Sequence, residues 1–504
     1  MNTREITHFI DGKPVADIPS RTGEVFNPAT GTVAGLVAFA DSDIVDRAVA
    51  SARGAFAGWR QSSLAQRTEV LFAYRELLVA RRGDLAAVIT AEHGKTLDDA
   101  AGEINRGLEV VEYVCGIPQL LKGAYSEQVS RGVDTYTIKQ PVGVCAGITP
   151  FNFPAMVPLW MVPVAVACGN SFVLKPSEKD PSAANLLAEW FCEAGLPDGV
   201  FNVVQGDRDA VNALLTHPDV ASVSSVGSTP VARHIYETAA AQGKRVQALG
   251  GAKNHMVVLP DADLDAAADA AVSAGYGSAG QRCMAISVVV TVGQTADELV
   301  ERLRARTQEL KVGAGDQESS EMGPLVTSEH RAKVESYLDA GVQEGAELVA
   351  DGRSHEVPSA GFYLGPSLFD CVTPEMSIYR DEIFGPVLLV ARVDTFEEAV
   401  DLINSNPHAN GTAVFTRDGG AARRFQNEIE VGMVGVNVPI PVPVAFHSFG
   451  GWRNSLYGDL HVYGEDGIRF FTRTKVVTSR WPDSPSTGVS LNFPHGEASA
   501  KPSP

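Results

Sequence analysis

The most informative stretch of this sequence is VGVCAGI, residues Val142 to Ile148, which is apolar and contains β-branched side chains. Such a run is typical of a fully buried strand in a parallel sheet. Similar runs follow it and are separated by helical stretches such as Ala183 to Ala194; they cover Ser171 to Leu174, Val200 to Val204 and Val220 to Val226. Alternation of strands and helices at this spacing predicts a doubly wound, mainly parallel α/β sheet.

The regions on either side predict further folded units. Residues 40–112 carry apolar side chains at helical spacing, and Asp41 offers an N-cap. A second alternating region starts near Asp263 and includes the strand-like run Ser287 to Val292. Because one hydrophobic core seldom serves 504 residues, we expect two or more folded units. The Pro- and Ser-rich tail, 482–504, is expected to be loosely ordered.

The charge composition argues against polyanionic partners. Lys and Arg number 41 and Asp and Glu number 61, which gives a formal net charge of −20 that repels phosphate backbones and anionic headgroups. The longest apolar region, 155–168, is interrupted by Pro158 and Pro163 and is shorter than the roughly 18 residues of a membrane span. The first residues lack the apolar run of a signal peptide. We therefore expect a cytoplasmic protein that binds neither nucleic acid nor membranes.

The cysteines predict no covalent or metal-based scaffold. The chain has 6 of them, and no pair has the CxxC spacing of a redox or zinc site. We therefore expect no disulfide and no bound metal. Five are expected to be small buried hydrophobic residues, namely Cys115, Cys145, Cys168, Cys192 and Cys371.

The sixth cysteine, Cys283, stands in a glycine-rich loop between a predicted helix and a predicted strand. A nucleophilic thiolate needs access and nearby dipoles that lower its pKa, so Cys283 is a candidate nucleophile. The segment Gly275 to Gly280 fits the GxGxxG pattern but follows a helix instead of a strand. We interpret its glycines as allowing the loop to approach a ligand closely.

A second candidate residue, Asn152, lies in the segment TPFNFP, Thr149 to Pro154, directly after the first apolar strand. Doubly wound sheets bind ligands at this end of their strands. The Asn152 amide could donate a hydrogen bond to an oxyanion. The alternative is a turn residue that makes only local hydrogen bonds.

The chain resembles the aldehyde dehydrogenase superfamily from about Phe9 to Val476. Five motifs occur in the order and approximate spacing of that family: Thr149 to Pro154, Lys175 to Glu178, Val226 to Thr229, Gly280 to Cys283 and Glu382 to Pro386. The resemblance implies an aldehyde dehydrogenase-like fold, with two doubly wound α/β domains and a small β extension for oligomerisation. It implies an NAD-binding domain at 1–125 and 141–252, a catalytic domain at 253–465, and oligomerisation strands at 126–140 and 466–481 that build a homo-oligomer, dimer or tetramer.

The resemblance also implies how the site works. Cys283 would add to an aldehyde, and Asn152 with the Cys283 N–H would hold the oxyanion. Hydride would then pass to NAD and leave a thioester on the enzyme. The residues implied to bind NAD are Thr149, Phe151, Lys175, Glu178, Lys179, Ser228, Gly250, Glu382 and Phe384.

Several of these cofactor residues have assigned contacts. Lys175 and Glu178 would contact the adenosine ribose, where the carboxylate disfavours the extra phosphate of NADP, although Lys179 weakens that argument. Ser228 would meet the pyrophosphate at a helix N-terminus. Glu382 would bind the nicotinamide ribose, and Phe384 would lie against the ring. The alternatives are a surface salt-bridge network for the charged residues and a helix cap for Ser228.

The chain departs from hydrolytic members of the family at one position. Those members carry a glutamate before paired glycines, where it activates water. Counting back from Cys283 places Leu249 there, and matching the glycines places Ala248 there. Because neither side chain accepts a proton, attack by water should slow by roughly two to four orders of magnitude. The thioester would then persist for a thiol, and coenzyme A fits.

Four segments resemble the CoA-acylating methylmalonate-semialdehyde branch of the superfamily: Pro154 to Trp160, Gly251 to His255, Gly280 to Ala285 and Pro439 to Pro443. The resemblance implies oxidation of methylmalonate or malonate semialdehyde to propionyl-CoA or acetyl-CoA, with release of CO2. It also implies a role in valine or inositol breakdown, between which the residues do not distinguish.

The aldehyde substrate of that branch also carries a carboxylate, which requires a cation in the pocket. Arg106 and Arg282 match the pattern of the branch, and a guanidinium binds a carboxylate through paired hydrogen bonds. The alternative for Arg106 is a solvated helix residue that pairs with Glu103 or Glu109.

Two other functions compete with this interpretation. One is a hydrolytic aldehyde dehydrogenase that yields a free acid and recruits another carboxylate, such as Glu382, as its base. The other is a catalytically silent binding or structural protein. The missing glutamate argues against the first, and intact Cys283 and Asn152 argue against the second.

Overall fold

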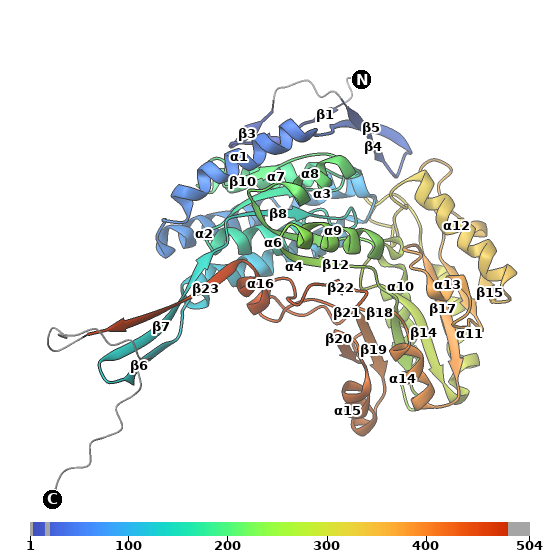
Figure 1. Cartoon of the computed structure of the whole chain (residues 1–504). Helices are drawn as coiled ribbons and strands as arrows, with labels where there is room; N and C mark the ends of the chain where they lie inside the picture. The colour runs from blue at the N-terminus through green and yellow to red at the C-terminus, as the bar shows by residue number, and fades with distance from the viewer. Residues whose placement is uncertain (1–3, 16–20, 482–504) are drawn as a thin grey trace, which may run out of the picture.

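The apolar runs around Val144 form the centre of an eight-stranded sheet in the computed structural model, which describes residues 4–15 and 21–481 (Figure 1). The predicted tail, 482–504, lies outside these residues. The strand order is β22-β12-β11-β8-β9-β10-β2-β3. The parallel strands are β8 (Val144–Ile148), β9 (Ser171–Lys175), β10 (Phe201–Val203), β11 (Val220–Val226) and β12 (Arg245–Leu249). This confirms the predicted doubly wound sheet.

Short antiparallel strands extend this sheet at both edges: β2 (Phe9–Ile10), β3 (Lys13–Pro14) and β22 (Leu456–Tyr457). The last of them comes from far along the chain, and its Leu456 pairs with Leu249 of β12. Three further strands form a separate sheet of order β1-β5-β4: β1 (Arg4–Ile6), β4 (Thr22–Asn27) and β5 (Thr32–Ala38).

Helices fill the predicted region 40–112 and connect the strands. They are α1 (Ser42–Trp59), α2 (Leu64–Ala80), α3 (Arg82–His93), α4 (Leu97–Cys115), α5 (Ile117–Leu120), α6 (Met156–Ala167), α7 (Ser182–Glu193), α8 (Arg208–Thr216) and α9 (Thr229–Ala241). Asp41 caps α1 as expected, because its side chain accepts a hydrogen bond from the Ile44 N–H. Every residue of α6 is buried, which suits a helix that is apolar on all sides.

The second predicted α/β unit is a seven-stranded sheet of order β15-β16-β17-β14-β13-β19-β20. Its strands are β13 (Asn254–Val258), β14 (Ile286–Val292), β15 (Glu347–Ala350), β16 (Ser367–Asp370), β17 (Val387–Val393), β19 (Gly411–Phe415) and β20 (Met433–Val436). Its helices are α10 (Leu264–Tyr276), α11 (Ala296–Glu309), α12 (Ser328–Gln343), α13 (Ser377–Arg380), α14 (Phe396–Asn404) and α15 (Gly419–Glu428), with short 3-10 turns η1 (Gly277–Gly280), η2 (Gly293–Thr295) and η3 (Gly352–Ser354). Asp263 caps α10.

A three-stranded antiparallel sheet projects from the body of the molecule (Figure 1). It contains β6 (Tyr125–Ser130), β7 (Val133–Pro141) and β23 (Thr472–Arg480). The predicted strand at 466–481 starts later than expected, because α16 (Gly464–Phe470) occupies its first residues. A two-stranded ladder of β18 (His408–Ala409) and β21 (Trp452–Arg453) completes the strands.

The burial prediction for the cysteines is right for three of the five. Cys115, Cys145 and Cys168 are buried, but Cys192 is only half-buried and Cys371 is exposed. The prediction is wrong for Cys371 because the residue follows β16 in a turn, with a φ of 54°. In the described part of the chain, no helix is long and apolar enough to cross a membrane.

Candidate active site

The loop that carries Cys283 has an unusual backbone. Ser278, Ala279 and Gly280 have φ values of 54°, 52° and 69°, a left-handed region in which non-glycine residues are strained. A Cβ atom on Gly280 would lie 2.0 Å from the Gly385 carbonyl oxygen. This glycine therefore approaches the chain at Gly385, whereas the sequence suggested that it approaches a ligand.

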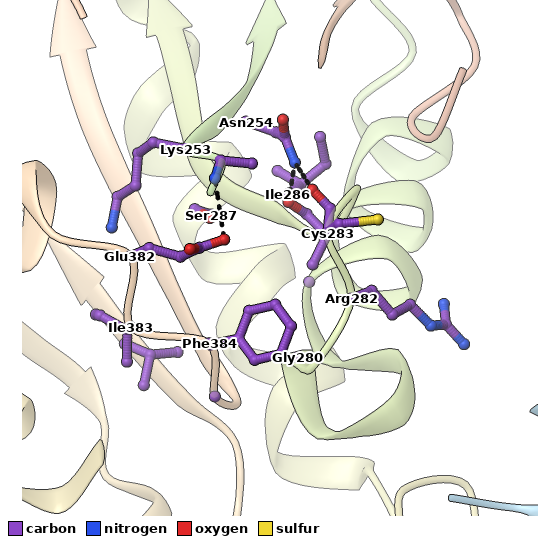
Figure 2. A pocket seen from close by; sticks show the side chains of 15 residues that line it. Lys253, Asn254, Gly280, Arg282, Cys283, Ile286, Ser287, Glu382, Ile383 and Phe384 are labelled. Carbon is purple, nitrogen blue, oxygen red and sulfur yellow. Dashed lines mark hydrogen bonds between the residues drawn. The ribbon is translucent and has the colours of Figure 1, made fainter. Parts of the chain in front are cut away.

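Two buried asparagines hold the nucleophile in place. The Cys283 carbonyl accepts a hydrogen bond from Asn254 Nδ2 at 2.9 Å (Figure 2). It accepts a second one from Asn410 Nδ2 at 3.2 Å. Asn254 also bonds to the Ala285 carbonyl at 2.9 Å. The sequence analysis missed both asparagines, because they come close to the Cys283 loop only in the folded chain.

The electrostatics of Cys283 differ from expectation. Burial is the main cause that raises the pKa of the thiol, to about 12; the Glu382 carboxylate acts in the same direction, and the N–H groups of Cys283 and Met284 oppose both effects. The nearby dipoles thus lower the pKa as expected, but burial outweighs them, and the pKa of Cys283 lies above its ordinary value.

Glu382 and Phe384 lie on one side of Cys283, in the cavity that Figure 2 shows. The Glu382 carboxylate accepts a hydrogen bond from the Ala252 N–H at 3.0 Å, and burial raises its pKa to about 7. A Cβ atom on Gly251 would lie 2.4 Å from this carboxylate, so a larger residue there would displace the Glu382 side chain. Phe384 packs edge-on against Phe151, with 5.7 Å between ring centroids. Phe151 and Phe384, two predicted cofactor residues that flank strands of different sheets, are thus in contact.

The other predicted cofactor residues gather at the carboxyl ends of the first sheet. Lys175 pairs with Glu178 at 3.1 Å, and the Lys179 ammonium lies 4.6 Å from the Phe151 ring centroid. Burial acts to raise the pKa of Glu178, but Lys175, the Glu178 N–H and Lys179 together outweigh it and leave the pKa below its ordinary value. A half-exposed carboxylate of this kind fits the hydroxyls of a ribose.

Ser228 is the N-cap residue of α9 but makes no capping hydrogen bond with its side chain. The first N–H groups of the helix therefore stay available to an anion, which fits a pyrophosphate. Gly250 has a different local role: a Cβ atom there would lie 2.3 Å from the Asn454 carbonyl oxygen. The Thr149 backbone N–H bonds to the Lys175 carbonyl at 3.1 Å and so joins the two cofactor segments.

A cavity of about 410 Å³ opens on the other side of Cys283. It contains both predicted carboxylate-binding arginines. Arg282 forms an ion pair with Asp99, and Arg106 pairs with Glu109 at 2.9 Å while donating to the Val442 carbonyl at 3.1 Å. The alternative proposed for Arg106, a pair with Glu109, thus coexists with its place in the cavity. Aromatic side chains missed by the sequence analysis complete the wall: Phe153, Trp160 and Phe449.

Asn152 directly precedes Phe153 of this cavity wall, and Lys95 holds its backbone. Its residue is 3% exposed, and its carbonyl accepts a hydrogen bond from Lys95 Nζ at 2.6 Å. Its side-chain amide makes no hydrogen bond to any of the residues that the structure describes. The amide is therefore available to a ligand, which the alternative of a purely local turn residue does not explain.

Comparison with known families matches residues 16–477 to the aldehyde dehydrogenase family. The chain belongs to this family. A malonate-semialdehyde dehydrogenase of Pseudomonas aeruginosa is 58% identical over 95% of this chain and 97% of its own length. A methylmalonate-semialdehyde dehydrogenase structure from Oceanimonas doudoroffii superposes with a TM-score of 0.94, at 52% identity, over 95% of this chain and 99% of that one. A Sinorhizobium meliloti protein assigned to the same activity and solved with NAD gives a TM-score of 0.95, at 53% identity, over 96% and 99% of the two chains.

This aldehyde dehydrogenase has no proton acceptor at the position of the hydrolytic glutamate. Ala248 and Leu249 are both buried on β12. Leu249 belongs to the hydrophobic core against which Cys283 packs, whereas Ala248 belongs to the core on the opposite face of the sheet. Of the two candidates from the sequence, Leu249 is therefore the one on the side of the nucleophile.

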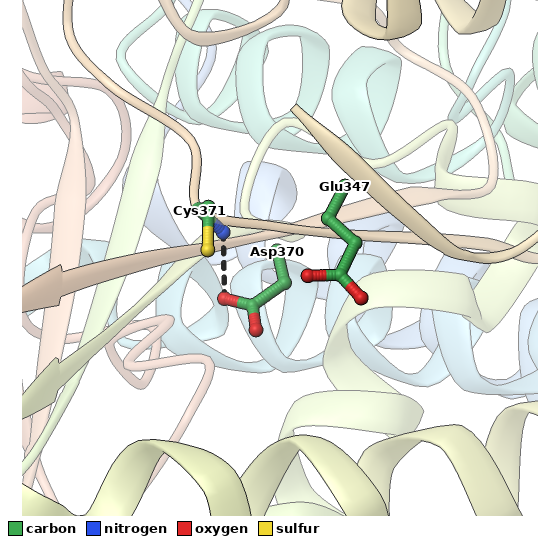
Figure 3. Close-up of side chains that lie close together, drawn as sticks. All are labelled: Glu347, Asp370 and Cys371. Atoms are coloured by element: carbon green, nitrogen blue, oxygen red, sulfur yellow. Dashed lines mark hydrogen bonds between the residues drawn. The ribbon is translucent and has the colours of Figure 1, made fainter. Parts of the chain in front are cut away.

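One cluster of ligand-type side chains lies away from the active site of this family member. Glu347, Asp370 and Cys371 place one ligand atom each within 4.8 Å of one another (Figure 3). Asp370 already bonds to the Arg392 guanidinium at 3.0 Å and to the Cys371 N–H at 2.6 Å. The ion pair explains the cluster without a cation, and the expectation that no metal is bound stays a prediction.

The Glu382→Gln variant of this aldehyde dehydrogenase should react faster with a thiol-directed alkylating agent. Removing the carboxylate removes a charge that disfavours the Cys283 thiolate, so iodoacetamide labelling at about pH 8 should rise roughly three- to tenfold. Because the pKa of Glu382 is about 7, the difference should vanish at about pH 6, where the carboxylate is protonated. Labelling of the parent chain should rise with pH between about pH 7 and 9, but by less than about tenfold per pH unit near pH 7, because ionisation of Glu382 raises the pKa of the thiol there.

The measurement is mass spectrometry of the peptide that contains Cys283, with Glu397→Gln on the exposed part of α14 as the matched control. A Glu382→Gln rate equal to or below that of the parent at about pH 8 contradicts the electrostatic account.

Proposed function

We propose that the chain is an NAD-dependent, CoA-acylating dehydrogenase of malonate semialdehyde and methylmalonate semialdehyde, which releases CO2 and forms acetyl-CoA or propionyl-CoA. The observation that carries this proposal is the cavity at Cys283, which is lined by both Arg106 and Arg282. The two candidates for the hydrolytic position, Ala248 and Leu249, are buried apolar residues. The names of the most similar relatives support the same substrate class.

The reaction begins at the sulfur of Cys283. Its thiolate adds to the aldehyde carbon, and the Asn152 amide with the Cys283 N–H stabilises the oxyanion that forms. NAD, when bound, accepts the hydride that leaves this carbon. The enzyme then holds a thioester, and Leu249 offers no base that would activate water against it.

The second carboxylate of the substrate defines its orientation. Arg282 and Arg106 lie on the cavity side of Cys283, where paired hydrogen bonds to a carboxylate are available. Loss of CO2 from this carboxylate leaves its electron pair on the neighbouring carbon, which then takes a proton. The CoA thiolate attacks the thioester carbonyl and expels the Cys283 thiolate, which restores the enzyme.

The cofactor residues act as binding groups. Lys175 and Glu178 fit the adenosine ribose, the N-terminus of α9 at Ser228 fits the pyrophosphate, and Glu382 fits the nicotinamide ribose. The carboxylate of Glu178 favours NAD over NADP, because it repels a 2′-phosphate. Thr149, Phe151, Lys179, Gly250 and Phe384 complete the proposed cofactor surface.

Product identification tests the proposed function. The purified chain, NAD, CoA and malonate semialdehyde should yield acetyl-CoA, NADH and CO2 in equal amounts, as measured by mass spectrometry and trapping of labelled CO2. Formation of free malonate, or of malonyl-CoA without CO2, contradicts the proposal.

The Arg282→Leu variant should lose its preference for a carboxylated aldehyde. The ratio of kcat/KM for malonate semialdehyde to kcat/KM for propanal should fall about 10- to 100-fold, because one charged hydrogen-bond pair is lost. Arg304→Leu, which removes an exposed ion pair on α11, is the matched control and should leave the ratio unchanged. An Arg282→Leu protein with the parental ratio contradicts the assigned role.

We further infer that the chain forms a homo-oligomer through the projecting sheet. Its outer residues Tyr125, Val129 and Val476 are 64%, 53% and 63% exposed, which is costly for apolar side chains on an isolated chain. Light scattering of the purified chain distinguishes monomer, dimer and tetramer. A cytoplasmic location and a role in valine or inositol breakdown stay predictions of the sequence.

A further inference from the structure

A fully buried ion pair lies beneath the loop that carries Asn152. Lys95 Nζ and Glu103 Oε2 are 2.7 Å apart, and both side chains are 0% exposed. Gly94 ends α3 with a φ of 93° and turns the chain so that Lys95 enters the interior. Glu103 lies within α4, on its buried face. The proposed reaction uses neither charge directly.

The pair holds the Asn152 loop at four points. Lys95 Nζ donates to the Asn152 carbonyl at 2.6 Å and lies 4.4 Å from the Phe153 ring centroid. The Glu103 carboxylate accepts hydrogen bonds from the N–H groups of Ala155 at 2.8 Å and Met156 at 3.1 Å. The two charges thus hold the middle of the turn between β8 and α6 and the first residue of α6.

The backbone at Gly94 and Lys95 contacts residues of the second α/β unit. Gly315 and Gly323 approach it so closely that a Cβ atom would lie 2.2 Å from the Lys95 carbonyl oxygen and 2.0 Å from that of Gly94. The Leu97 N–H also bonds to the Gly315 carbonyl at 3.0 Å. Lys95 therefore touches both units of the fold.

The same anchor segment reaches the nucleophile loop. The Val326 N–H donates to Gln281 Oε1 at 3.1 Å, and Gln281 Nε2 lies 3.5 Å from the Pro324 carbonyl oxygen. Gln281 is fully buried and precedes Cys283 by two positions. A continuous set of contacts thus runs from Asn152 through Lys95 and residues 315–326 to the Cys283 loop.

We propose that the Lys95–Glu103 pair positions the Asn152 amide relative to Cys283, so that the oxyanion formed from the aldehyde meets a donor already in place. Stability alone does not explain the pair, because apolar residues of similar volume are often as stabilising as a buried ion pair. Oxyanion donors, by contrast, act only when they are preorganised. The inference rests on the proposed role of Asn152 and makes Lys95 and Glu103 positioning residues.

The test removes both charges together. The double variant Lys95→Met, Glu103→Gln leaves no unpaired buried charge and keeps an acceptor for the Ala155 and Met156 N–H groups, so thermal unfolding should stay near that of the parent. The single-turnover rate of NADH formation from propanal should fall about 10- to 100-fold, while the KM for propanal changes less than about threefold. Propanal makes the result independent of the proposed carboxylated substrate.

A cycle with Asn152→Ala separates positioning from a general structural effect. Because the pair acts through Asn152, the triple variant should be no slower than Asn152→Ala alone, whereas independent effects would multiply. Glu92→Gln is the matched control, since Glu92 is a buried carboxylate that bonds to Ser182 and does not contact the loop; it should keep the parental rate.

Three results would overturn the inference. A double variant with the parental rate, while Asn152→Ala is slow, shows that the amide acts without the pair. Losses that multiply in the triple variant show that the pair acts elsewhere. If Asn152→Ala itself keeps full activity, the proposed role of Asn152 fails, and the positioning role fails with it.

Discussion

Replacing Cys283 by alanine should lower NADH formation by about four to six orders of magnitude, since loss of a nucleophile that forms the covalent intermediate removes the catalytic route itself. NAD affinity should stay within about threefold of the parent value, because the proposed adenosine and pyrophosphate contacts lie on the first sheet. The rate is followed by NADH absorbance and the affinity by quenching of protein fluorescence.

Cys371→Ala is the control for this variant, because Cys371 is exposed and distant from the cavities that contain Cys283. It should retain the parental rate. A Cys283→Ala protein within about tenfold of the parent would assign the nucleophile to another residue. A normal rate with strongly weakened NAD binding would instead point to a role of Cys283 in the cofactor site.

Omission of CoA should convert steady turnover into a single burst. With NAD and malonate semialdehyde alone, about one NADH should form per site, followed by a phase roughly two to four orders of magnitude slower. Leu249 and Ala248 cannot activate water, so the thioester on Cys283 waits for a thiol. Addition of CoA after the burst should restore the full rate, and stopped-flow absorbance resolves both phases.

The hydrolytic alternative makes the opposite prediction, and Glu382 is its natural base. The carboxylate shares a cavity with Cys283, and its pKa of about 7 suits proton abstraction near neutral pH. Rapid CoA-independent release of a free acid that disappears in Glu382→Gln would establish this alternative. A slow phase unchanged by Glu382→Gln supports the acylating reaction.

The sequence predicted the parts of the fold that depend on local patterns. Buried strands such as Val220–Val226 are continuous apolar runs, and their β-branched residues distinguish them from helices. The start of β23 was misplaced because residues 464–470 carry apolar and polar side chains that suit either structure. The seven-residue helix is stabilised by its packing against α6, which no local pattern encodes.

In the candidate site, too, residues that belong to local motifs were predicted, and residues that act through distant contacts were missed. Cys283 and Asn152 were recognised because each belongs to a motif, and the fold leaves the Asn152 amide without a partner among the residues described. Asn254, Asp99 and Lys95 were missed, since each acts on a residue that lies far away in the sequence. The pKa of Cys283 was misjudged because burial and the distant Glu382 outweigh the local N–H groups.

The strand β22 completes the first sheet from near the far end of the chain, where Leu456 and Tyr457 pair with β12. A chimera that exchanged everything after residue 252 with a relative would therefore bring a foreign edge strand to the parental eight-stranded sheet. The unit that can be transplanted is discontinuous. Recombination between members of this family should keep residues 452–457 from the same parent as β12, although the proposed domain boundaries place them on opposite sides.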